Sequence, residues 1–194
     1  MISTLSKKHS FNAVYDSQKV YRLILDAMSN PAKVVMINGY ADKLYGRYPA
    51  FIAVAITLLD NEVSFHVCGN DSLTDEIASI ALARREKNAN ADFVFVCDLD
   101  YMEHAIENAK CGTLADPHKS ATIIIQTDGA PSCGLTLYGP GIDGKTVITV
   151  SKAVKDAIAV RDAQHYEYPQ GIDLLFISDT GELLAIPRFV RVVG

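Results

Sequence analysis

The segment Gly139–Thr146 has the residue spacing of a phosphate-binding loop. Its sequence, GPGIDGKT, matches G-x-x-x-x-G-K-[ST], in which backbone amides and a lysine surround the phosphates of a nucleotide. Such a loop must lead into a helix whose N-terminal amides face the phosphates. Residues 147–150 (VITV) instead favour a strand. A hairpin loop is therefore the preferred interpretation. The alternative is a nucleotide site built from Gly139, Gly144, Lys145 and Thr146.

A second group of reactive side chains lies between Asp98 and His104. Carboxylates at positions 98, 100 and 103 and the imidazole follow a predicted strand, and α/β proteins hold ligands at such strand ends. These groups could bind a metal ion or exchange protons. Asp100 and Glu103 also have the spacing of a capping box, which uses both side chains on helix amides. We favour the cap.

Histidine and cysteine spacings predict neither a metal centre nor a redox centre. The histidines are at 9, 66, 104, 118 and 165 and the cysteines at 68, 97, 111 and 133, without an H-x-x-x-H or C-x-x-C pattern. We expect four buried and reduced thiols, the usual state of free cysteines in cytosolic proteins. No G-x-S-x-G motif occurs and no lysine stands out as a cofactor-bound amine, so we expect no catalytic residue, metal or cofactor.

Two loops combine tyrosines with a proline: residues 45–49 (YGRYP) and 164–169 (QHYEYP). Tyrosine is common at contact surfaces because it joins apolar area to a polar tip. An ordered loop packed on its own domain explains the composition equally well, so both interpretations stay open.

Length and composition predict one domain spanning residues 1–194. No apolar run follows the basic residues Lys7 and Lys8, as secretion would require, so we expect a cytoplasmic protein. Of these residues 49% are apolar and 21% are charged, and the formal net charge is −5. A negative chain without a basic cluster argues against nucleic-acid binding. The longest apolar stretch, residues 50–59, is half of the roughly 20 residues that cross a bilayer, so we expect no membrane segment.

Hydrophobic spacing predicts alternating helices and strands in the first half of the chain. A helix over 17–28 ends before Pro31, and Pro49 opens a buried helix over 50–59. Apolar runs predict strands at 33–38, 62–67 and 93–97. A capping-box-like start at Ser72 predicts a helix reaching Arg84, and a further short helix ends near Gly112.

The second half is rich in strands. We expect them at 121–127, 135–138, 146–150, 172–178, 183–186 and 189–193, with a helix beginning at Ser151. This order predicts an α/β domain of three layers, α/β/α, around a mixed sheet. The sheet is expected to be parallel where helices cross over and antiparallel in hairpins over 135–150 and 174–192.

Several sequence blocks together resemble a known family. The most specific are YPQGIDLL (168–175), LLAIPR (183–188) and RLILDAMSNP (22–31), and LYGPGI (137–142) lies between them. In this order they resemble the H subunit (PhnH type) of the carbon-phosphorus lyase system, over residues 15–192. The family often has glycine where this chain has Ala32, and Lys145-Thr146 is not a family feature.

The resemblance implies a fold similar to a truncated pyridoxal-phosphate-dependent transferase that lacks the cofactor lysine. It also implies a homodimer that assembles with the G, I and J subunits of carbon-phosphorus lyase. That complex attaches an alkylphosphonate to the ribose of ATP in place of adenine, and the H subunit is required for this coupling. We therefore expect a non-catalytic subunit of an enzyme complex.

Within the most family-like stretch, Asp173 and Arg188 are the residues we expect to form a structural pair or an interface contact. A pairing inside one hairpin is slightly preferred. The neighbouring candidates for the same role are Tyr168, Gly171 and Pro187.

Overall fold

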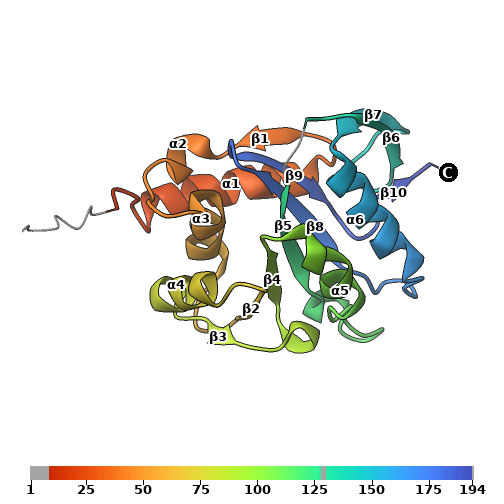
Figure 1. The fold of residues 1–194 in the computed structure, drawn as a ribbon. Helices are drawn as coiled ribbons and strands as arrows, with labels where there is room; N and C mark the ends of the chain where they lie inside the picture. Colours follow the sequence, from red (N-terminus) through yellow and green to blue (C-terminus); the bar gives the residue numbers. More distant parts are fainter. Residues whose placement is uncertain (1–8, 128–129, 194) are drawn as a thin grey trace, which may run out of the picture.

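A seven-stranded mixed sheet forms the centre of the computed structural model, which describes residues 9–127 and 130–193 (Figure 1). In spatial order its strands are β1 (Val34–Met36), β9 (Glu182–Ile186), β8 (Asp173–Ser178), β5 (Thr122–Thr127), β4 (Phe93–Val96), β2 (Ser64–Cys68) and β3 (Arg84–Arg85). The strands from β8 to β3 are parallel, and only β9 runs antiparallel to its neighbours. The predicted mixed sheet is thereby confirmed.

One face of this sheet is covered by α1 (Tyr15–Ser29), α2 (Asn38–Ala41), α3 (Pro49–Leu58) and α4 (Asp71–Ala81). In α3 every residue from 50 to 55 is buried, because the helix lies between the sheet and its neighbours α1 and α4. The amphipathic α1 buries only one side, which includes Val20, Ile24 and Ala27.

The other face is covered by α5 (Met102–Glu107), α6 (Lys152–Ala163) and a small antiparallel sheet. This sheet has the order β10 (Arg191–Val192), β6 (Cys133–Tyr138) and β7 (Thr146–Val150). Figure 1 shows α3 and α4 on one side of the central strands and α5 and α6 on the other. Single-turn 3-10 helices complete the chain: η1 (Asn88–Asn90), η2 (Leu99–Tyr101) and η3 (Pro117–Lys119). Among the described residues, no helix combines the length and apolar character needed to span a membrane.

The final strand departs from the prediction. The sequence places residues 174–192 in one hairpin, but β10 pairs with β6 in the small sheet. The chain leaves β9 through a turn in which the Val190 amide donates to the Pro187 carbonyl. This turn redirects the last residues across the α6 side.

Two predicted helix caps are wrong. The cap of α4 is Asn70, whose Oδ1 accepts from the Leu73 amide at 2.9 Å, whereas Ser72 lies inside the first turn. Asn70 takes this role because its backbone is extended, the conformation of an N-cap. Asp98 likewise caps η2, and the N-terminus of α5 has no side-chain cap, so Asp100 and Glu103 form no capping box. Helix α5 also ends at Glu107, before the predicted limit near Gly112.

The helices that follow β2 and β4 go to opposite faces of the sheet. Helix α4 after β2 packs in one layer, and α5 after β4 packs in the other. The loops at the carboxyl ends of these neighbouring strands therefore diverge and leave a crevice. In open α/β sheets such a switch point is the usual location of a ligand site.

Candidate functional site

A cleft lies at this switch point. It consists of two cavities of about 720 and 420 Å³ that share lining residues. The shared residues are Arg47, Tyr48, Cys97, Gln126 and Asp179. They come from the carboxyl ends of β4, β5 and β8 and from the segment before α3, and the smaller cavity extends to Gly69 and Asn70 after β2. In the sequence, Arg47 and Tyr48 are recognisable only as part of a tyrosine-proline loop.

An aromatic stack anchors Arg47 to the core. The guanidinium carbon lies 5.3 Å from the centroid of the Tyr48 ring. Tyr48 stacks on Phe51 at 6.1 Å, and Phe51 packs edge-on against Phe95 at 5.7 Å. Within the described part of the chain, no carboxylate lies within ion-pair distance of Arg47. The guanidinium is thus held by the face of a ring and not by an acid.

Tyr48, Asn70 and Cys97 form a polar group in the wall of the cleft. The Asn70 amide nitrogen donates to the Tyr48 hydroxyl at 3.5 Å and to the Cys97 sulfur at 3.6 Å. Burial raises the pKa of Tyr48, and the neighbouring Cys97 raises it further. Tyr48 therefore contributes a neutral hydroxyl at physiological pH. All four cysteines are free thiols, but only Cys68 is buried as predicted, and the other three are partly exposed. Cys97 alone among the four lines the cleft.

Gln126 and Asp179 join the ends of β5 and β8. The Gln126 amide nitrogen donates to the Asp179 carboxylate, which fixes the orientation of the amide because the carboxylate can only accept. The Gln126 oxygen is buried without a hydrogen-bond partner among the described residues. Asp179 lies in a turn in which the Gly181 amide donates to the Ser178 carbonyl. This turn borders the cleft.

The charges of the cleft are mixed. Carboxylates of Asp42, Asp98 and Asp179 line it together with the single guanidinium of Arg47. No group of three or more His, Cys, Asp or Glu side chains in residues 9–127 and 130–193 is arranged to hold a metal ion. Neither cavity is lined by a lysine. The arrangement can bind a small polar molecule through hydrogen bonds and opposite charges.

The residues predicted from the C-terminal motif lie outside the cleft, but the structure brings them together. Arg188 binds Asp173 through two side-chain contacts, 2.5 Å from Nη2 and 3.3 Å from Nε. The Arg188 amide also donates to Asp173, at 2.8 Å, and Nη1 donates to the Pro117 carbonyl at 2.6 Å. The pair closes the β8–β9 hairpin and ties it to the loop around η3.

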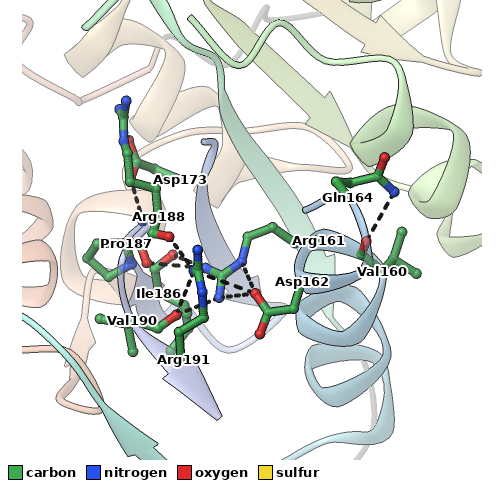
Figure 2. Close-up of polar contacts among 10 residues, drawn as sticks. All are labelled: Val160, Arg161, Asp162, Gln164, Asp173, Ile186, Pro187, Arg188, Val190 and Arg191. Carbon is green, nitrogen blue, oxygen red and sulfur yellow. Dashed lines mark hydrogen bonds and ion pairs between the residues drawn. The ribbon is translucent and has the colours of Figure 1, made fainter. Parts of the chain in front are cut away.

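Arg161, which the sequence analysis did not single out, is the buried centre of the neighbouring network (Figure 2). Its side chain is 1% exposed. It donates to the carbonyls of Ile186, Pro187 and Val190 at 3.2, 3.2 and 2.6 Å, and to the Asp162 carboxylate at 2.9 Å. Burial lowers the pKa of Arg161, an effect that Asp162 opposes. Arginine is mostly exposed in proteins, but the spacing of Arg161 from Val154, Ala157 and Ile158 places it on the buried side of α6.

The other motif residues surround Arg188. Gly171 has a φ of +149°, and a β-carbon there would lie 3.0 Å from the Arg188 β-carbon. Tyr168 precedes a cis proline and packs its ring 5.2 Å from that of Phe189, with 79% of the residue exposed. Pro187 contributes its carbonyl to Arg161. The motif therefore builds a rigid corner with an exposed tyrosine.

The phosphate-loop sequence lies in the β6–β7 hairpin. Gly139, Gly141 and Gly144 have positive φ angles, and β7 follows Lys145 directly. A β-carbon on Gly139 would lie 2.6 Å from the Phe189 carbonyl oxygen, so close packing requires glycine there. No helix N-terminus follows the loop. Nucleotide binding at Gly144, Lys145 and Thr146 stays an untested alternative.

The carboxylates and imidazole between residues 98 and 104 are not gathered at one point. Asp98 accepts from the Asp100 amide and lines the smaller cavity. His104 instead contacts Asn108, the C-cap of α5.

The fold and the cleft define an α/β protein with a candidate small-molecule site at the switch point of a largely parallel sheet. The chain belongs to the PhnH family, because the model described as bacterial phosphonate metabolism protein (PhnH) matches residues 9–193. It is also 25% identical over 176 residues to HtxG of Stutzerimonas stutzeri, a protein provisionally named as a C-P lyase subunit. That alignment covers 90% of this chain and 85% of HtxG. The resemblance identified from sequence motifs is confirmed.

Proposed function

We propose that this chain is a subunit of the carbon-phosphorus lyase core complex in alkylphosphonate catabolism. The observation that carries the proposal is the family match over residues 9–193, which includes both the cleft and the C-terminal corner. HtxG, the relative provisionally named as a C-P lyase subunit, adds support because the alignment extends over most of both chains.

In the proposed role the subunit is needed for coupling the phosphonate to the ribose of ATP and acts in assembly, not in bond-making. It is a cytoplasmic homodimer of single-domain chains that binds the G, I and J subunits. Exposed apolar side chains support a role in contacts. Val14, the N-cap of α1, and Tyr21 and Leu25 within α1 are 71%, 51% and 51% exposed and follow one side of the helix. Tyr168 is a second exposed aromatic group, at the rigid corner.

The fold is proposed to be similar to that of pyridoxal-phosphate-dependent transferases. A mostly parallel seven-stranded sheet with one antiparallel strand and helices on both faces supports this likeness. The cofactor of those enzymes is held as a Schiff base by a lysine. Because no lysine lines either described cavity, these residues do not fit the covalently bound cofactor.

The proposed role can be tested by reconstituting the coupling reaction. The G, I and J subunits are supplied with ATP and methylphosphonate, with or without this chain, and release of adenine is measured. We expect phosphonate-dependent release only when the chain is present, saturating at a fixed ratio of chain to complex. Equal release in its absence would contradict the proposal.

A further inference from the structure

The cleft holds a cation, Arg47, whose hydrogen-bond donors have no partner among the described residues. Its guanidinium carbon lies over the face of the Tyr48 ring, 5.3 Å from the centroid. Three carboxylates line the same cleft, yet none within the described residues pairs with Arg47. A guanidinium held in this manner is suited to a planar, two-point contact with an oxyanion.

The first turn of α3 adds further donors beside Arg47. The helix begins at Pro49, and its N-cap Tyr48 makes no side-chain cap bond. The first amides of a helix have no partner inside the helix, and those of Ala50 and Phe51 belong to residues that line the larger cavity. These amides and Arg47 favour a negative group at this end of the cleft.

Near the carboxyl ends of β5 and β8 the cleft instead favours a positive group on the ligand. Asp179 uses one carboxylate oxygen to accept from Gln126, and its second oxygen has no hydrogen bond within the described residues. Asp42 and Asp98 add two further negative charges to the lining. A ligand with only negative groups would therefore meet more like than opposite charge. An ammonium group on the ligand removes this mismatch.

We propose that the cleft binds a small zwitterion. Its oxyanion, a phosphonate or a carboxylate, is held by Arg47 and the first amides of α3, and its primary ammonium group is held by Asp179. This inference goes beyond the proposed function, which assigns the chain no ligand. It depends on that function only in the choice of a phosphonate as the first probe.

Isothermal titration calorimetry of the purified chain tests the inference with three matched probes. These are 2-aminoethylphosphonate, ethylphosphonate, which lacks the ammonium group, and β-alanine, which has a carboxylate in place of the phosphonate. We expect 2-aminoethylphosphonate to bind at least about tenfold more tightly than ethylphosphonate, the order of effect of one charged hydrogen bond. The third probe decides which oxyanion the cleft prefers, and tighter binding of β-alanine would assign it to amino-carboxylates.

Variants connect the binding to the two charged side chains that the proposal uses, Arg47 and Asp179. R47Q is expected to weaken 2-aminoethylphosphonate at least about tenfold, whereas the matched control R84Q, on the exposed edge strand β3, leaves it unchanged. D179N is expected to abolish the advantage of 2-aminoethylphosphonate over ethylphosphonate. Circular dichroism confirms that each variant is folded.

The proposal is overturned if the wild-type chain binds neither 2-aminoethylphosphonate nor β-alanine, or if R47Q and R84Q bind alike. It is also overturned if ethylphosphonate binds as tightly as 2-aminoethylphosphonate. Because the titration contains no other subunit, such a failure leaves the role in the lyase complex untouched, and a failed reconstitution leaves the zwitterion site untouched.

Discussion

We expect Arg161 to contribute more to the stability of the fold than its exposed neighbours on α6, because its side chain is buried and fully hydrogen-bonded. It satisfies three backbone carbonyls and the Asp162 carboxylate from inside the protein. Removing one partner of a buried ionic network leaves the others without compensation. We predict that Arg161→Ala lowers the free energy of unfolding by about 3–5 kcal/mol. Urea denaturation measures this difference.

The control for Arg161 is on the same helix. Lys155 is exposed on α6, and Lys155→Ala is expected to change stability by no more than about 0.5 kcal/mol. Alanine favours helices, so lost helix propensity cannot explain the effect at Arg161. A loss below about 1 kcal/mol at Arg161 would show that water can replace its contacts.

Ala32 occupies a conformation that suits glycine. Its φ is +79°, in the left-handed region, where a β-carbon costs roughly 1–2 kcal/mol. Replacing Ala32 with glycine removes this cost, but the greater freedom of glycine in the unfolded chain offsets part of the stabilisation. We predict that Ala32→Gly raises the free energy of unfolding by about 0.5–1 kcal/mol. The same change at Ala159, inside α6 and exposed, should lower it by about 1 kcal/mol. Equal losses at both positions would refute the account of Ala32.

The contacts of Asp92 are expected to make part of the folding stability depend on acidic pH. Burial raises the pKa of Asp92, but hydrogen bonds from Lys110 and from the Ser64 hydroxyl and amide outweigh it, so that the net pKa is lowered. A carboxyl with a depressed folded-state pKa stabilises the protein fully above its unfolded pKa of about 3.9. This contribution is lost as pH falls through the lowered value.

We therefore expect the stability difference between the wild-type chain and Asp92→Asn to be constant above about pH 5. It should shrink as the pH falls further. Urea titrations at a series of pH values provide the measurement. A difference that is independent of pH down to acid unfolding would contradict the assignment.

At the scale of elements, the start of α4 distinguishes two candidate caps. Asn70 accepts from the Leu73 amide, whereas Ser72 is exposed inside the first turn. We predict that Asn70→Ala destabilises the protein by about 1 kcal/mol. Ser72→Ala should change stability by less than about 0.5 kcal/mol. If thermal denaturation shows comparable losses of stability for the two variants, Ser72 would also act as a cap, as the sequence predicts.

Most elements could be predicted because their signals are local. Pro49 begins α3 and Ser151 caps α6 as expected, and the apolar runs form β4, β5 and β8. The wrong predictions occur where the same local sequence pattern is compatible with two structures. Both Asn70 and Ser72 satisfy cap chemistry, and only backbone conformation decides between them. Residues 189–193 have a strand pattern that cannot indicate which sheet they join.

The candidate site was less predictable because it depends on distant parts of the chain. Arg47, Asn70, Cys97 and Asp179 meet only when three strand ends and the segment before α3 are placed together. No spacing in the sequence records that juxtaposition. The Asp173–Arg188 pair was more accessible to prediction, since both residues lie in one hairpin within the most family-like stretch.

At the scale of the whole molecule, the cleft and the exposed apolar side chains lie on different parts of the surface. The cleft faces the carboxyl edge of the sheet, whereas exposed apolar groups on α1 and at the Tyr168 corner lie elsewhere on the surface. A protein with this arrangement can hold a small molecule while it contacts other chains. This arrangement suits the proposed membership of a larger assembly.

The most direct test of that proposed membership is co-expression of the tagged chain with the G, I and J subunits, followed by size exclusion and mass measurement of the purified material. We predict that all four proteins elute in one particle with fixed stoichiometry, containing two copies of this chain or a multiple of two. Elution of the chain by itself, with none of the other subunits retained, would contradict its assignment to the lyase complex.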